Sequence, residues 1–193
     1  MKRTMAAIGV AVVMAGVTMS VQAQGVAQPS GPTMDQTKAW LESDGRELLR
    51  VDRLQTDQFH FAFVAGTDAV ETLTLNDCIL YWRTVAQSHV TVRSQTGRPT
   101  TRTYDVQVPL EDVRGVQVVP DALLNDVPVY KVQLSIQNHP GGVSSTFSIN
   151  SGNPVLIRSA SLPVQTPEDG QRIANAISHA AALCGVELGG GVF

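Results

Sequence analysis

The residues with the greatest chemical capacity in this chain are its four histidines and two cysteines. The histidines stand dozens of positions apart, at His60, His89, His139 and His179. Zinc sites usually take two ligands that lie close together in sequence, so this spacing does not predict one. A cysteine nucleophile needs a neighbouring histidine, but Cys184 follows His179 by five positions and would lie on a different helix face. Cys78 stands in an apolar segment, which favours a structural role.

Other motifs for catalysis or ligand binding are missing from the sequence. No serine-hydrolase elbow of the form G-x-S-x-G occurs, and residues 142–145 come nearest to it. The two main phosphate-cradling glycine motifs do not occur, and Asn125-Asp126 is too little for a calcium loop. Two carboxylate pairs, Glu111-Asp112 and Glu168-Asp169, fit a turn and the first turn of a helix. We therefore predict no catalytic residue, no metal site and no cofactor.

The first 23 residues have the pattern of an export signal. Two basic residues, Lys2 and Arg3, precede an apolar run over residues 5–19, and small residues at Val21 and Ala23 suit a signal peptidase. We predict cleavage after Ala23, which leaves Gln24 as the first residue of a periplasmic or secreted protein. The alternative is an uncleaved membrane anchor, although the run is shorter than the roughly 20 apolar residues that span a bilayer.

The charge of the mature chain limits its partners. Cleavage would leave 12 Lys and Arg residues against 17 Asp and Glu residues, a formal charge of −5. Nucleic acids and anionic membrane surfaces select clustered basic residues, so neither is predicted as a partner. No second apolar run approaches membrane-spanning length, and we predict no transmembrane segment in the mature chain.

The two cysteines predict a disulfide. An even pair in an exported protein is typically bonded, because the compartment is oxidising. We predict a bond between Cys78 and Cys184 that ties the closing helix to a central strand. The alternative is a pair of buried free thiols.

Two helices are predicted at the ends of one domain over residues 33–185. Thr33 and Gln36 form a capping box, although Asp44-Gly45 weakens the first helix in its middle. Thr166 caps the closing helix, in which Pro167 takes the first position, and Gly185 ends it. Residues 24–32 form a flexible lead-in and residues 186–193 a flexible tail.

Between the helices the apolar pattern alternates, as in strands with one buried face. The alternation begins at Phe59 and continues through Leu73, Leu75 and residues 78–82, after a turn at Asn76-Asp77. Further strands are predicted at residues 90–94, 102–108, 115–119, 129–137, 143–149 and 155–162. Short, turn-rich connections favour antiparallel pairing. The fold class is α+β, with a curved antiparallel sheet or small barrel of about six to eight strands.

Several short segments carry a resemblance. These are a Trp40-Leu41 pair in the first helix, CILYW at 78–82, PLEDV at 109–113 and ALCG at 182–185. In this order they resemble a group of uncharacterised bacterial exported domains, and they are similar to pleckstrin-homology-like barrels closed by a C-terminal helix. The resemblance implies a fold rather than an activity.

The function predicted from these observations is a non-enzymatic binding or interaction module of the cell envelope. Its partner would be an envelope protein, a peptide or a lipid, bound at a sheet edge or beside a helix. The surface that we favour lies around residues 90–108, where arginines and threonines interrupt the apolar pattern. The alternative is a small hydrolase or transferase whose site is assembled only in space, around His60 or His89.

Overall fold

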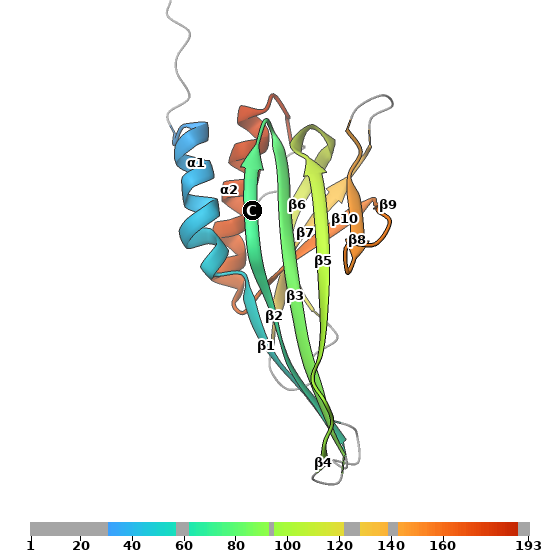
Figure 1. Ribbon diagram of the computed structural model, residues 1–193. Coiled ribbons are helices and arrows are strands. Elements are labelled where there is room, and N and C mark those ends of the chain that lie inside the picture. The colour runs from blue at the N-terminus through green and yellow to red at the C-terminus, as the bar shows by residue number, and fades with distance from the viewer. Residues whose placement is uncertain (1–30, 57–61, 93–94, 122–127, 139–142, 189–193) are drawn as a thin grey trace, which may run out of the picture. The chain divides into compact units, whose positions relative to one another are not determined.

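A long antiparallel hairpin forms the centre of the fold (Figure 1). In the computed structural model, which describes residues 31–56, 62–92, 95–121, 128–138 and 143–188, it comprises β2 (Ala62–Asn76) and β3 (Ile79–Val92). Asp77 and Cys78 join the strands with φ angles of 48° and 61°, the left-handed pair that suits a two-residue hairpin. The predicted turn is thus shifted by one residue. Placing Cys78 on a strand was wrong, because this residue lies in the turn itself.

The described strands form two antiparallel sheets. The larger has the order β1-β2-β3-β5-β8-β9, with β4 paired to β3, and the smaller has the order β10-β7-β6. The strands outside the hairpin are β1 (Arg50–Thr56), β4 (Gln95–Thr96), β5 (Thr100–Pro109), β6 (Val113–Pro120), β7 (Tyr130–Ile136), β8 (Thr146–Ile149), β9 (Val155–Leu156) and β10 (Ser159–Val164). The α+β class with antiparallel sheets is confirmed, whereas the small-barrel alternative is wrong because the described strands divide between two sheets.

Two strand boundaries differ from prediction for physical reasons. Residues 78–82 and 90–94 were predicted as separate strands, but β3 runs without a break through residues 79–92. Residues 155–162 were predicted as one strand, but the chain changes sheets after Leu156 and pairs again from Ser159. Alternation alone does not report which sheet a segment joins. The predicted start of the alternation at Phe59 lies outside the described residues.

The first helix begins as its capping box predicts. The Thr33 N–H donates to Gln36 Oε1 at 2.8 Å, and the Gln36 N–H donates to Thr33 Oγ1 at 3.3 Å. The α-helical part, α1 (Met34–Trp40), widens into the π-helical turn η1 (Leu41–Gly45) where Asp44-Gly45 was expected to weaken it. A Cβ on Gly45 would approach the Trp40 ring to 3.1 Å, so a glycine fits this wide turn.

The closing helix, α2 (Pro167–Leu183), is capped by Thr166, whose Oγ1 accepts a hydrogen bond from the Asp169 N–H at 3.1 Å. It ends at Gly185, with a φ of 83°, where the next N–H bonds back to Ala181. Val186 and Leu188, in the segment predicted as a tail, pack against the core. No helix in the described ranges has the length and hydrophobicity needed to cross a membrane.

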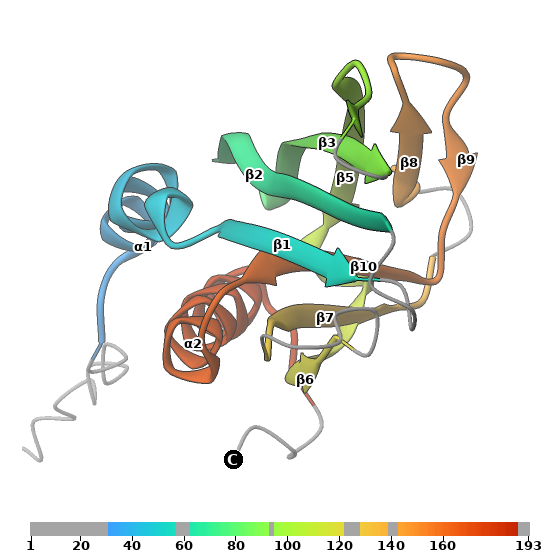
Figure 2. The same cartoon turned by 90° about the horizontal axis from the view of Figure 1, so that it is seen from below.

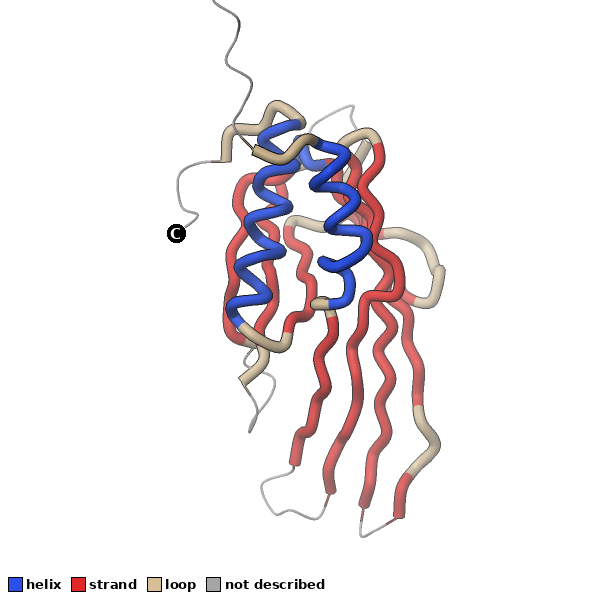
Figure 3. The backbone as a smooth tube through the Cα atoms, turned by 90° about the vertical axis from the view of Figure 1, so that its left-hand side faces the viewer, coloured by secondary structure: helices blue, strands red, loops and turns tan. Residues whose placement is uncertain are grey.

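Both helices lie side by side, and the larger sheet extends beyond them (Figure 3). The inner stripe of α2 is buried against the smaller sheet through Ile173, Ile177 and Ala181. The larger sheet adds Leu73 and the fully buried Trp82 to the same core. Seen from below, β10 and β7 lie beneath the strands β3, β5 and β8 (Figure 2). A cleft lies between these two groups of strands.

Candidate functional site

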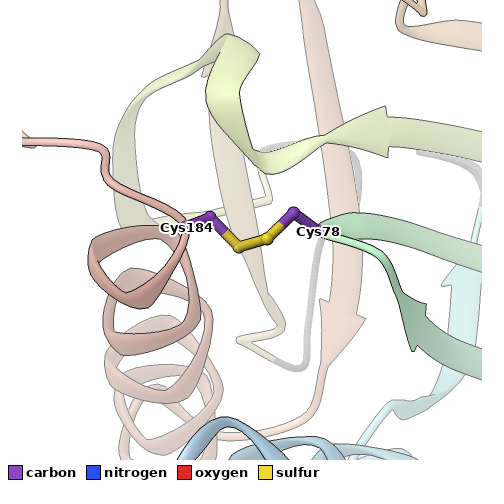
Figure 4. Close-up of a disulfide and its surroundings, with 2 residues drawn as sticks. All are labelled: Cys78 and Cys184. Atoms are coloured by element: carbon purple, nitrogen blue, oxygen red, sulfur yellow. A yellow bond between two sulfur atoms is a disulfide. The ribbon is translucent and has the colours of Figure 1, made fainter.

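The cysteines form the predicted disulfide (Figure 4). Cys78 in the hairpin turn and Cys184 at the end of α2 are bonded, with Cα atoms 5.9 Å apart. The bond closes a separation of 106 positions and joins the closing helix to the central hairpin. Its place is therefore that of a brace between two elements of the core.

The histidines do not converge on a carboxylate and a hydroxyl in the described part of the chain. His89 lies on β3 opposite Ala65, and the His179 Nε2 is 2.7 Å from the carbonyl oxygen of Pro32. His60 and His139 lie outside the described residues, as do the predicted cleavage residues Ala23 and Gln24. Within the described ranges, no three His, Cys, Asp or Glu side chains are placed to hold a metal ion.

A buried polar cluster contains Ser145, the last residue of the segment that comes nearest to the hydrolase motif. The Ser145 Oγ donates to Asp112 Oδ2 at 3.0 Å, and both residues are buried. The Ser145 N–H donates to Asn138 Oδ1 at 2.7 Å, and the Asn138 amide donates to the Ile157 carbonyl at 2.9 Å. These bonds hold the start of β8 to the 3₁₀ turn η2 (Leu110–Asp112), which gives the serine and the aspartate a structural role.

The outer face of the larger sheet carries a second polar cluster. Tyr81 Oη and Arg83 Nε both donate to Asp105 Oδ1, at 2.6 and 2.7 Å. Burial raises the pKa of the Asp105 carboxyl, but these two hydrogen bonds and the Arg83 charge outweigh burial, and the pKa is lowered overall. Burial, followed by the bond to Asp105, raises the pKa of the Tyr81 phenol. The cluster fastens β3 to β5 by mutual contacts.

The candidate site is a cleft of about 380 Å³ between the two sheets. One wall belongs to the larger sheet and is mainly apolar. Its residues are Trp82, Val106, Tyr104 and Phe147, with Thr84 among them. The Tyr104 and Phe147 rings stack with their centroids 5.8 Å apart and their planes inclined by 17°. Trp82 is fully buried and forms the floor.

The register of the larger sheet explains this apolar wall. Trp82 lies opposite Val106, Val106 opposite Phe147, and Phe147 opposite Val155, so one row crosses four strands on one face. A second row begins at Thr84 and runs through Tyr104 to Ile149. Directly opposed residues share a face, and neighbouring rows lie two positions apart. We call these two rows together the apolar rows.

The facing wall of the cleft is mixed. Ser159 and Ser161 of β10 and Lys131 of β7 give it polar groups, and Ile157, Ala160 and Pro163 line the same side. Asp68 and Asp121 also line the cleft, so its charged side chains have both signs. Among the described residues, no hydrogen bond joins the Lys131 ammonium to a serine hydroxyl. The geometry is that of a binding cleft with one mainly apolar wall and one mixed wall that presents two serine hydroxyls.

A second hollow lies between α1 and α2. It is larger, about 720 Å³, and more open, and its lining includes Trp40, Arg172 and His179. The Arg172 guanidinium lies 5.7 Å from the centroid of the Trp40 ring, and His179 is engaged by Pro32. Because these contacts already join the two helices, we take the inter-sheet cleft as the candidate site.

Sequence reasoning did not describe this cleft, although the favoured surface contains two of its lining residues, Tyr104 and Val106. The surface favoured there, around residues 90–108, includes one of the five exposed large apolar side chains in the described ranges, Val90. The other four are Val143, Ile149, Val155 and Leu156, around β8 and β9. The available signal for this exposed edge beside the cleft was the apolar pair Val155-Leu156 directly after a turn-rich segment, which is unusual for a solvated hairpin end.

Comparisons with protein-family models, curated proteins and solved structures found no match to this chain.

Proposed function

We propose that this protein is an exported, non-enzymatic binding module that holds a small amphipathic molecule in the inter-sheet cleft. The observation that carries the proposal is the contrast between the two walls of the cleft. Trp82, Val106 and Phe147 line one side, and Ser159 and Ser161 line the other. Small-molecule sites typically have volumes of about 300–1,000 Å³, with an apolar lining and a few polar groups that orient the ligand.

Export and an envelope location belong to the same proposal. The basic and apolar pattern of the first 23 residues supports it, together with a disulfide of the kind that persists in oxidising compartments. A relationship to the pleckstrin-homology-like group, in a form whose strands divide between two sheets, is part of the same proposal and is supported by the closing helix and the CILYW segment. An amphipathic ligand fits the mild acidity of the chain, because such binding does not depend on a basic surface.

The test fills the cleft and measures binding of a fluorescent amphipathic probe, anilinonaphthalene sulfonate. Ser161→Phe adds a ring at an exposed position of the facing wall, so the fold should tolerate it while the cleft loses volume. Gln117→Phe is the matched control, because it adds the same ring to an exposed position of the same sheet away from the cleft. We expect the first variant to lose probe binding and the control to keep it.

Thermal unfolding of both variants verifies that the fold is intact. Probe binding that is equal in the parent and in both variants would refute the cleft as the site. The enzyme alternative is tested alongside: turnover of an ester, phosphate, peptide or glycoside substrate that His89→Ala abolishes would refute the non-enzymatic proposal.

A further inference from the structure

The apolar rows do not stop at the limits of the cleft. The exposed fraction of the side chains rises along the first row from 0% at Trp82 and 6% at Val106 to 55% at Val155. The second row ends at Ile149, which is 49% exposed. Neither Val155 nor Ile149 lines the cleft, yet each continues a row that does. The apolar surface therefore leads from the buried floor out to the edge of the sheet.

We propose that the ligand carries an unbranched apolar chain, which lies along the apolar rows and leaves the cleft over Val155 and Ile149. This inference rests on the proposed function and names the ligand class: a long-chain alkyl or acyl compound with a polar head. The chain end lies near Trp82, and the head lies beyond the exposed end of the rows.

The dimensions of the rows favour a chain over a compact ring system. From Trp82 to Val155 the row crosses three strand spacings, about 14 Å. The two rows are separated by two residues along each strand, about 7 Å. An extended chain advances about 1.2 Å per bond, so roughly 12 carbons span the row. The surface is long and narrow, as an unbranched chain requires.

A long ligand would gain binding free energy by covering the exposed end of the apolar rows. Val155 and Ile149 lose contact with water only when something lies over them, and each buried methylene adds favourable transfer free energy. We expect the affinity for saturated fatty acids of 6 to 16 carbons to rise by up to about fourfold per methylene. The rise should level off near 12 carbons, where the row ends.

The decisive variant is Val155→Ser combined with Ile149→Ser. Both side chains are half exposed, so the fold should persist. We expect at least tenfold weaker binding of the 12-carbon acid and unchanged binding of the 6-carbon acid, which does not reach them. Leu156→Ser is the matched control: Leu156 is 69% exposed and lies opposite Thr146, on the other face of β9. It should bind all chain lengths as the parent does.

The direction of the chain is tested by fluorescence. The protein has two tryptophans, so Trp40→Phe leaves Trp82 as the only one. A dodecanoic acid brominated at its terminal carbon should quench Trp82 more strongly than one brominated next to the carboxyl group. The corresponding alcohols and a lysophospholipid of equal chain length distinguish a free acid from a lipid as the source of the chain.

The outcomes separate the two proposals. Two results would overturn the proposal of an unbranched chain: an affinity that is independent of chain length, or equal losses of affinity in Leu156→Ser and in the double variant. The cleft would still stand as the binding site if Ser161→Phe loses probe binding. A dimer that dissociates in the double variant would also overturn the unbranched chain, because a second copy would then cover the exposed end. If neither the probe nor any fatty acid binds, the cleft itself is refuted as a binding site.

Discussion

The two ends of one cross-strand row show how differently a sheet can use the same apolar pattern. At the β2 and β3 end, Leu73 and Trp82 are buried in a core to which α2 and the smaller sheet also contribute. At the β8 and β9 end, Phe147 is half-buried and Val155 is largely exposed. All four residues face the same way, and what differs is the layer that lies over them. The alternation of a strand thus specifies a face, whereas burial depends on what covers that face.

The β2 and β3 hairpin, at the buried end of the row, is also held by the disulfide between Cys78 and Cys184. Removing this bond should change the free energy of unfolding more than any other variant proposed here. In the chain-entropy model, a loop of 106 positions gives about 4–5 kcal/mol of stabilisation. We therefore expect Cys78→Ser with Cys184→Ser to lower the free energy of unfolding by up to about that amount. Urea unfolding of parent and variant measures it, and titration of the denatured, unreduced parent should find no free thiol. A loss below about 1 kcal/mol would show that the helix is held without the brace.

Truncation at the two ends of the row compares them directly. Trp82→Ala should cost about 3–5 kcal/mol, because it leaves a cavity in a fully buried part of the core. Val155→Ala should change stability by less than about 0.5 kcal/mol, because its side chain is already 55% exposed. Urea unfolding of the ligand-free protein gives both values. Similar losses in the two variants would mean that the exposed end is covered in solution.

The contact between α2 and the smaller sheet offers a finer test of how tightly the core is packed. An alanine usually stabilises a helix relative to glycine, by about 1 kcal/mol. At Gly170 in α2, however, the added Cβ would lie 2.8 Å from Val118 Cγ1, so we expect Gly170→Ala to destabilise by about 1–3 kcal/mol. Gly115→Ala is the control, since its Cβ would meet nothing nearer than 3.9 Å. A stabilised Gly170→Ala protein would contradict this packing.

Local sequence signals predicted the parts of the fold that depend on neighbours in the chain. The caps at Thr33 and Thr166 were found because a cap and its partner lie three positions apart. The disulfide was found because the number of cysteines and the export pattern limited the alternatives. Cys78 was misplaced by one residue, since a left-handed cysteine in a hairpin turn is uncommon.

The cleft could not be predicted in the same way. Its apolar wall depends on which residues of β3, β5, β8 and β9 lie opposite one another, and between β5 and β8 the chain passes through two strands of the other sheet. One shift in register would place Trp82 and Phe147 on different rows. The change of sheet after Leu156 also brings β10 into the facing wall, and no local pattern marks it.

The smallest predicted effect concerns the outer face of the same strands, where Tyr81 and Arg83 bind Asp105. The folded-state pKa of Asp105 is lowered, so its contribution to stability is fully present above the ordinary value of about 3.9. That contribution is lost as the pH falls through the lowered pKa. We expect Asp105→Asn to be less stable than the parent at pH 7, with a difference that shrinks in acid. Because Arg83 is 40% exposed, the loss at pH 7 should be smaller than the losses predicted above.

The tyrosine supplies an independent readout of this cluster. Burial and then Asp105 raise the pKa of the Tyr81 phenol, so removing the carboxylate charge should lower that pKa while the part due to burial stays. The absorbance of ionised tyrosine, followed from neutral to alkaline pH, measures the change in Asp105→Asn. Tyr81→Phe identifies which of the three tyrosine transitions belongs to this residue. An unchanged titration in Asp105→Asn would mean that the 2.6 Å contact between Tyr81 and Asp105 does not persist in solution. On the outer face, β3 and β5 would then lack the polar contact between Tyr81 and Asp105. On the inner face, the same two strands pack through the apolar pair Trp82 and Val106.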